Sequence, residues 1–256
     1  MTSANYRPNA PVTQNGFTAQ TFSPDPALIA ASNSGRFLTN RPDYSTGYSG
    51  FEVTLVKRMS NKWFARGAAS WMDWHENLEG PRAVQNPTRT DVTGGQAGAP
   101  QDGRSGPQVD GGQIAPRSGG SGKGDIFYNA RWQVVFNALY QLPANFELGT
   151  SIFGRQGYVY PVVLRLNAGN DGAQRTLAVP TIDDRRYKSL VDVDFRLAND
   201  IKLGGRASMQ VSLDLFNAFN RGTILGRNRQ ANSGAFGNAT DVLAPRILRL
   251  GLRLNF

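Results

Sequence analysis

The feature that most constrains this chain is an alternation of apolar and polar residues with a period of two. Such alternation is typical of a β-strand that has one face in an apolar environment and the other in a polar one. Helical spacing is confined to one short candidate at residues 23–31, with Asp25 as N-cap and Pro26 in its first turn. The alternation predicts strands at residues 51–56, 63–72, 129–142, 146–155, 191–197, 209–215 and 248–256. We therefore expect an all-β, antiparallel fold.

Alternation alone leaves two architectures open, because a soluble β-sandwich shows it as well as a transmembrane β-barrel. The lengths of the connections favour the barrel. Short turns at residues 60–62, 143–145 and 198–205 alternate with long loops at residues 75–124, 161–187 and 220–244. Outer-membrane barrels have tight turns at one rim and long external loops at the other.

Large aromatic residues recur at one spacing along the predicted strands. Trp63 and Trp71 are eight residues apart on one face, and so are Trp132 and Tyr140. Eight residues at about 3.4 Å each, tilted by about 40°, rise roughly 21 Å, close to the ~25 Å apolar band between the aromatic girdles of such barrels. We therefore predict that these four residues form an aromatic girdle.

The opposite faces of the predicted strands are polar and carry both signs of charge. Opposite charges on neighbouring strands can pair, each pair contributing about 0.2–1 kcal/mol. Arg196 is one candidate for such pairing with the aspartates of the neighbouring strands. A solvated outer face of a soluble sheet is the alternative interpretation. The residues predicted to face the lumen are Arg66, Asn129, Arg131, Gln133, Asp192, Asp194, Asp214, Arg249 and Arg253.

Seven strands do not close a bacterial single-chain barrel, which has an even number of at least eight. An open sheet in lipid leaves edge groups unpaired, at several kcal/mol for each group. We therefore expect residues 42–256 to be the C-terminal part of a larger barrel and residues 1–41 to be an irregular extracellular-loop segment with a short helix. Closure by oligomerisation is the alternative.

Four segments carry a family resemblance: YSGFEV with the following KR at 48–58, FGRQGYVYP at 153–161, LDLFNAFN at 213–220 and APRILRLGLRLNF at 244–256. They resemble TonB-dependent outer-membrane receptors, most closely the Oar-like branch, whose members often carry a carboxypeptidase-regulatory-like N-terminal domain. The likeness runs from about Arg41 to Phe256, and it is specific at the C-terminus and looser in the loops.

The resemblance implies a barrel of about 22 strands around a plug, in the cell outer membrane of a Gram-negative-type bacterium. Such a receptor imports a scarce large nutrient with energy from the inner membrane. The implied partners are outer-membrane lipid and lipopolysaccharide, the missing N-terminal strands and plug, the TonB complex acting through that missing part, and the barrel-assembly machinery. Siderophore, glycan and peptide transporters share this strand pattern, so the ligand stays open. Two alternatives remain: a passive or adhesive outer-membrane barrel without energy coupling, and a soluble β-sandwich binding module.

Composition argues against several other functions. The net charge is +9, but the arginines are spread singly along the chain, so we expect no nucleic-acid partner. The chain has no Cys and a single His, His75, and we predict no catalytic residue, metal site or cofactor. The loop at 75–124 is rich in Gly and Pro, and we expect it to be mobile. In the last long loop, Arg221, Arg227 and Arg229 can contact lipopolysaccharide phosphates or an anionic ligand, or form a solvated basic rim.

The final strand matches the assembly signal that outer-membrane barrels present to the insertion machinery. The pattern is a polar residue, a Gly two positions later and hydrophobic residues ending in Phe. It falls here on Arg249, Gly251, Leu254 and Phe256, with Leu254 standing where an aromatic residue is common. The alternative is that Phe256 only ends an apolar strand face.

Deleting Phe256 from the full-length protein is expected to lower its level in the outer membrane, because the terminal aromatic residue of the signal is lost. The measurement is the amount of protein in the outer-membrane fraction, with Phe256→Tyr as the control that keeps a terminal ring. Unchanged levels after the deletion contradict the signal assignment.

Overall fold

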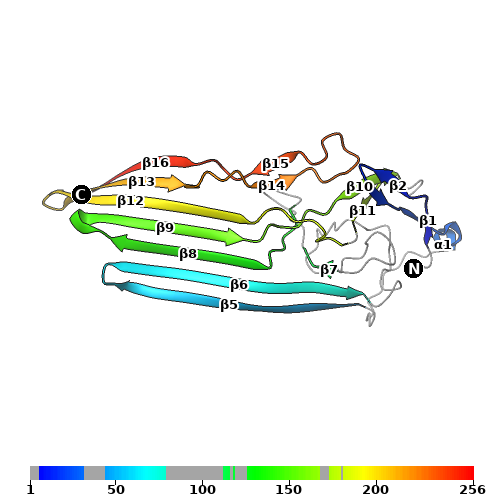
Figure 1. Cartoon of the computed structure of the whole chain (residues 1–256), viewed down its shortest axis with the longest axis horizontal. Helices are drawn as coiled ribbons and strands as arrows, with labels where there is room; N and C mark the ends of the chain where they lie inside the picture. The colour runs from blue at the N-terminus through cyan, green and yellow to red at the C-terminus, as the bar shows by residue number, and fades with distance from the viewer. Residues whose placement is uncertain are drawn as a thin grey trace.

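The computed structural model describes residues 6–31, 44–78, 112–115, 118, 126–167, 173–179 and 181–256. Its main element is an antiparallel sheet in the order β16-β13-β12-β9-β8-β6-β5 (Figure 1). The strands are β5 (Tyr44–Ser60), β6 (Trp63–Leu78), β8 (Trp132–Gln141), β9 (Phe146–Arg155), β12 (Leu190–Gly204), β13 (Ala207–Phe216) and β16 (Ile247–Asn255). A short strand, β7 (Gly112–Gln113), pairs with the end of β6. The seven strands predicted from the alternation are therefore confirmed.

Several strand boundaries differ from the prediction. β5 and β6 extend beyond the predicted ranges of 51–56 and 63–72, to 44–60 and 63–78. The turn expected at residues 198–205 is wrong, because β12 continues to Gly204. Ile201 and Leu203, which are 39% and 55% exposed, continue the apolar face of the strand. The alternation therefore extends into the segment that was expected to be a polar turn. β8 begins at Trp132 and not at the predicted residue 129, so Asn129 and Arg131 precede the strand.

The two rims of the sheet differ in the length of their connections. At one rim, β5 and β6 are joined by Asn61 and Lys62, which have φ angles of +52° and +68°. Positive φ at both positions is the geometry of a two-residue type I′ hairpin, whose twist matches the strands. Ala144 and Asn145 of the β8–β9 turn also have positive φ angles. The long connections all leave from the opposite rim (Figure 1).

The register places the apolar residues of the predicted alternation on one face in all seven strands, whereas a few others, such as Val135 and Phe153, lie on the opposite face. One row across the sheet begins with the Trp63–Tyr140 pair. It comprises Trp63, Tyr140, Leu148, Leu197, Leu213 and Leu250. Each of these side chains is at least 36% exposed, and Leu250 is 77% exposed. Within the described ranges, therefore, no second layer covers this row of the apolar face.

The edges of the sheet are β5 and β16, which do not pair with each other. The all-β class is confirmed, whereas the sheet is not closed into a barrel. The short helix α1 (Pro26–Ala31) lies where it was predicted, and Asp25 Oδ1 accepts a hydrogen bond of 3.1 Å from the backbone N–H of Ala27.

Helices long and apolar enough to cross a membrane are absent from the described part of the chain.

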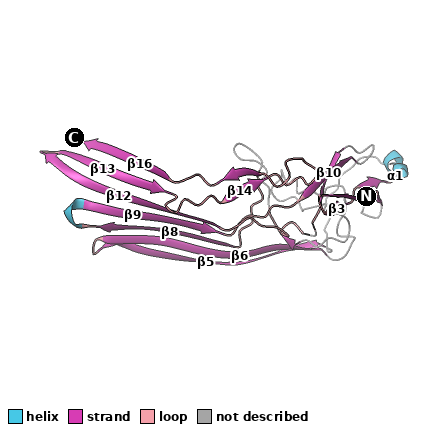
Figure 2. Ribbon diagram, turned by 45° about the horizontal axis from the view of Figure 1, so that its top comes forward, coloured by secondary structure: helices cyan, strands magenta, loops and turns pink. Residues whose placement is uncertain are grey.

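Four small two-stranded sheets lie beyond the long-loop end of the main sheet and are called the cap (Figure 2). Two of them belong to the segment expected to be irregular loop at residues 1–41. The four pairs are β1 (Tyr6–Pro8) with β4 (Phe22–Pro24), β2 (Val12–Gln14) with β3 (Phe17–Ala19), β10 (Val163–Asn167) with β11 (Ala173–Leu177), and β14 (Ile224–Arg227) with β15 (Ala239–Val242). Most of the 75–124 loop lies outside the described residues, including much of the stretch expected to be mobile.

The main buried apolar clusters lie in the cap and its connections. Phe17 packs edge-on against Phe236 beside one cluster, with ring centroids 5.6 Å apart. The buried members of this cluster are Ala19, Val162, Leu164, Leu166, Leu177, Val179 and Ala231. The second cluster comprises Ala115, Phe127, Val159 and Ile182. The long connections therefore have an apolar core that brings the N-terminal hairpins together with residues from two later connections.

The polar face of the sheet contains a charged cluster around Asp214. Its Oδ1 lies 3.3 Å from Arg196 Nη1, and its Oδ2 lies 2.9 Å from Arg249 Nη2. The register pairs Arg196 with Asp214 and Asp214 with Arg249, so all three residues project from one face. The pairing of opposite charges across these strands is thus confirmed.

Replacing Asp214 with Asn is expected to lower the free energy of unfolding by about 1–2 kcal/mol, because two cross-strand charge pairs are lost and two guanidinium groups are left together. Urea titration followed by circular dichroism measures this change. Arg253→Gln, on the same face of β16, is the control, with an expected change within about 0.5 kcal/mol. Equal effects of the two substitutions contradict a special role for the cluster.

Candidate functional site

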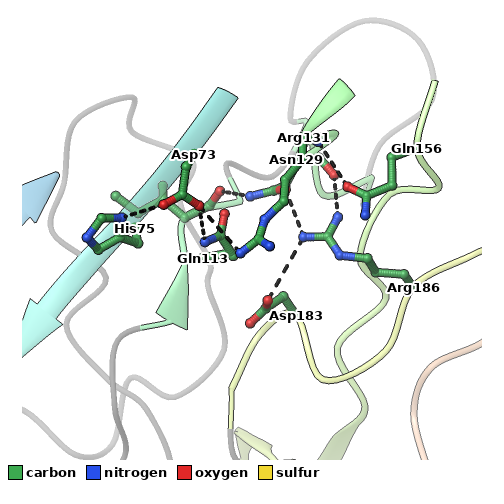
Figure 3. Close-up of polar contacts among 9 residues, drawn as sticks. Asp73, His75, Gln113, Asn129, Arg131, Gln156, Asp183 and Arg186 are labelled. Carbon is green, nitrogen blue, oxygen red and sulfur yellow. Dashed lines mark hydrogen bonds and ion pairs between the residues drawn. The ribbon is translucent and has the colours of Figure 1, made fainter. Parts of the chain in front are cut away.

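A junction of polar side chains lies where the sheet meets the cap (Figure 3). Asp73, near the end of β6, is one of its centres. Asp73 Oδ1 accepts a 2.8 Å hydrogen bond from Gln113 Nε2 and lies 3.4 Å from Arg131 Nη2. Its other oxygen lies 3.3 Å from His75 Nδ1. These contacts hold the connection before β8 against the end of β6.

The second centre of the junction is Asn129, which is 1% exposed. Its Nδ2 donates to the carbonyl of Ile114 at 2.6 Å. Arg186 donates from Nη2 to Asn129 Oδ1 at 2.9 Å and from Nη1 to the Asn129 carbonyl at 2.8 Å (Figure 3). Because both the nitrogen and the oxygen of this buried amide have hydrogen-bond partners, the amide fixes the two loops that it joins relative to each other.

Arg186 is itself held in the connection between β11 and β12. Burial lowers the pKa of its guanidinium from the usual value, while the charge of Asp183, 4.0 Å away, raises it. Arginine stays protonated in proteins, so the side chain remains a cation. Gly157 lies against the carbonyl of Tyr187, and a side chain at position 157 would collide with that backbone. The two loops therefore approach each other closely.

A cavity of about 450 Å³ lies within the cap next to this junction. Its walls come from the connection before β8, the segment between β9 and β10, the connection before β12, and the β14–β15 hairpin. The lining contains the stacked rings of Tyr160 and Tyr187, whose centroids are 4.7 Å apart. The hydroxyl of Tyr187 accepts a 2.8 Å hydrogen bond from the backbone N–H of Arg227. Burial raises the pKa of Tyr187, so this hydroxyl keeps its proton.

Two of the three arginines predicted as anion contacts line this cavity. Arg229 is 7% exposed, and its guanidinium lies 4.5 Å from the ring centroid of Phe127. Arg227 Nη1 donates to the carbonyl of Gly237. Arg221 lies elsewhere, at the end of β13, where its backbone N–H donates to Asn217 Oδ1 at 2.9 Å. The structure therefore groups Arg227 with Arg229 and separates both from Arg221.

The four predicted girdle residues form two cross-strand pairs. Trp63 is opposite Tyr140 near the short-turn rim, and Trp71 is opposite Trp132 near the long-loop rim. The ring of Trp71 also stacks on Phe51 at a centroid distance of 6.0 Å. Large aromatic side chains thus lie at both ends of the same apolar face.

The remaining polar residues named from the sequence lie mainly on the opposite face. Asp194 Oδ1 accepts a 2.9 Å hydrogen bond from the backbone N–H of Asn217. Arg66 is opposite Asn137, and Gln133 is opposite Arg155. Two further members of this face, Asp192 and Arg253, are opposite Phe153 and Gln210, respectively.

The predicted assembly signal occupies the edge strand β16. Arg249 contacts Asp214, while Gly251 lies opposite Ser212, whose hydroxyl would have to rotate away from a side chain at position 251. Leu254 is exposed on the apolar face, and Phe256 lies just beyond the end of β16 and is fully exposed.

Two asparagines that were not predicted as functional residues organise the start of β16. Asn217 and Asn220 both have positive φ angles, which asparagine tolerates better than most residues. Asn217 Nδ2 donates to the carbonyl of Ala244 at 2.7 Å, and Asn220 Oδ1 accepts from the N–H of Arg246 at 3.0 Å. The sequence signal for these two hydrogen bonds is a pair of asparagines three residues apart in LDLFNAFN.

No protein-family model matches the sequence, and no curated protein matches it. Among the described residues, His, Cys, Asp and Glu side chains do not form a group of three that can hold a metal ion.

Replacing Asn129 with Ala is expected to loosen the cap, because the Ile114 carbonyl and the Arg186 guanidinium lose a buried partner at about 1–3 kcal/mol for each group. Hydrogen exchange at the amides of Tyr160 and Tyr187, which bond across the two loops, should accelerate. The control is Asn199→Ala, whose side chain donates to the Ala144 carbonyl at the opposite rim. Unchanged exchange in the Asn129 variant contradicts this role.

Proposed function

We propose that this chain is the C-terminal barrel segment of a TonB-dependent outer-membrane receptor that imports a large nutrient. In this proposal the long connections form the external face of the receptor, and the short turns face the periplasm. The observation that carries the proposal is the apolar row exposed across the strands of the sheet.

An exposed apolar face is unfavourable in water, at roughly 25 cal/mol for each Å² left uncovered. A β-sandwich module would bury that face beneath a second sheet. Among the described residues, each sheet other than the main sheet has only two strands. Acyl chains of a bilayer provide the apolar environment instead, and the aromatic pairs at both ends of the face fit the two membrane interfaces. These features favour a sheet that is part of the wall of a transmembrane barrel, here called the membrane wall, over a soluble module.

The edges of the sheet support a wall that is larger than seven strands. Each of β5 and β16 has a row of backbone groups without a strand partner in this sheet. In hydrocarbon such groups cost several kcal/mol each, so they require further strands. The polar face around Asp214 then lines a wet lumen or contacts a plug. Energy coupling through TonB is proposed on the family resemblance of the four segments described above.

Because the chain has no Cys, paired single-cysteine variants test which face contacts lipid. Val134 lies on the apolar face of β8 and is 39% exposed, whereas its neighbour Gln133 is exposed on the polar face. In the full-length protein in lipid vesicles, with any Cys outside the present sequence replaced by Ser, an NBD fluorophore on Val134→Cys should be quenched severalfold more by acyl-chain nitroxides than one on Gln133→Cys. Equal quenching contradicts the proposed membrane wall.

Energy coupling needs a separate measurement, made in cells with and without TonB. The proposal expects the protein in the outer-membrane fraction of both strains and nutrient uptake only in the strain with TonB. Equal uptake in the two strains identifies a passive barrel instead.

A further inference from the structure

We infer that a pocket on the polar face of the sheet binds a neutral sugar unit of the imported nutrient. This inference rests on the proposed function, because it names the chemical class of what the receptor takes up. The pocket lies at the long-loop end of β5, β6 and β8 and has a volume of about 510 Å³. Sites for small molecules usually measure roughly 300–1,000 Å³.

The strands contribute a row of hydrogen-bonding side chains to this pocket. Glu52 is opposite Ser70, and Ser70 is opposite Gln133, so the three side chains project from the same face of the sheet. Glu52 and Gln133 are exposed on that face. A carboxylate only accepts hydrogen bonds, whereas a hydroxyl and an amide both donate and accept. The row therefore presents donors and acceptors to the same ligand.

Three tyrosines, Tyr48, Tyr128 and Tyr158, line the same pocket. Tyr48 is 68% exposed and Tyr128 is 45% exposed, so their rings are accessible to a ligand. The hydroxyl oxygen of Tyr48 lies 3.1 Å from the point that a Cβ at Gly50 would occupy, so its ring leans along β5 over this glycine, in the direction of Glu52. The rings of Tyr128 and Tyr158 pack edge-on with centroids 5.5 Å apart. The pocket thus offers aromatic surface next to the hydrogen-bonding row.

Aromatic surface beside mixed donors and acceptors suits a sugar. One face of a pyranose ring presents C–H bonds, which pack against the electron-rich face of an aromatic ring. Each hydroxyl group of the sugar both donates and accepts hydrogen bonds, so one sugar can use an amide, a hydroxyl and a carboxylate together. A purely apolar ligand would cover these polar groups without giving them partners.

The charges in and near the pocket favour a neutral ligand over an ionic one. Glu52 is the one charged side chain among the described residues that line the pocket, and it repels a carboxylate or a phosphate. A cation is disfavoured as well, because the guanidinium of Arg155 already lies 3.5 Å from the centroid of the Tyr158 ring. Arg155 is also opposite Gln133, in the same row as Glu52.

The experiment applies the full-length protein to an array of immobilised oligosaccharides, in a detergent without a sugar headgroup so that the detergent does not compete. The array holds neutral oligosaccharides and acidic counterparts of the same backbone that carry carboxylate or sulfate groups. At least one neutral oligosaccharide should bind saturably, and at least about fivefold more tightly than its acidic counterpart. Excess tetramethylammonium, a probe for an aromatic cation site, should not displace it. The inference is overturned if every neutral oligosaccharide fails to bind, if the acidic counterparts bind equally well, or if tetramethylammonium displaces the sugar.

Two pairs of variants localise the binding. Gln133→Ala should weaken binding of the neutral oligosaccharide by about fivefold, whereas Gln141→Ala, on the same face of β8 at its short-turn end, should leave it unchanged. Tyr48→Ala should weaken binding by about fivefold, whereas Tyr48→Phe keeps the ring and should bind within about twofold of the unaltered protein. The three side chains are exposed, so these substitutions should preserve the fold. Equal effects within either pair contradict the assignment.

The outcome is separable from that of the proposed function. The lipid-quenching measurement on the Val134 and Gln133 cysteine variants tests the membrane wall alone. Quenching on one face without sugar binding overturns the ligand assignment only. Sugar binding that depends on Gln133 and Tyr48, in a protein whose two faces are quenched equally, overturns the membrane wall and leaves the pocket assignment supported.

Discussion

The rest of the structure depends on the fact that a sheet with one apolar face needs an apolar surrounding on that side. Among the described residues no second layer covers that side, and side chains such as Trp63, Tyr140 and Leu250 are exposed. The polar face holds charged groups at hydrogen-bonding distance, with Asp214 between two arginines. In the proposed function the sheet is therefore a wall between two different environments, and each strand contributes one residue in two to each side.

The strands can be predicted from the sequence because the alternation that marks them is a local pattern. The period of two in stretches such as residues 146–155 and 248–256 follows from the geometry of a single strand, whatever the strand pairs with. Boundaries were harder to predict. The sequence places the end of β12 too early, because Asn199, Asp200 and Lys202 are typical turn residues. Asp200 and Lys202 nevertheless alternate with apolar Ile201 and Leu203, which continue the strand.

The cap could not be predicted in the same way, because its contacts join distant parts of the chain. In the sequence Arg186 is marked only as half of the Arg185–Arg186 pair that follows two aspartates, yet it holds Asn129, 57 residues away in the chain. The cavity likewise depends on which loops fold together. Arg221, Arg227 and Arg229 looked equivalent as a basic group in one loop, and only the β14–β15 hairpin separates the two that share a cavity from the third.

The larger cap cluster is held together by contacts between parts of the chain that are far apart in the sequence. It joins Ala19, Val162 and Ala231, residues that are separated in the chain by strands of the sheet. Bringing such residues together costs chain entropy, and paired strands lower that cost because they place the ends of the connections at one rim. We therefore expect the apolar residues of the connections to be covered late in folding, after the sheet has paired.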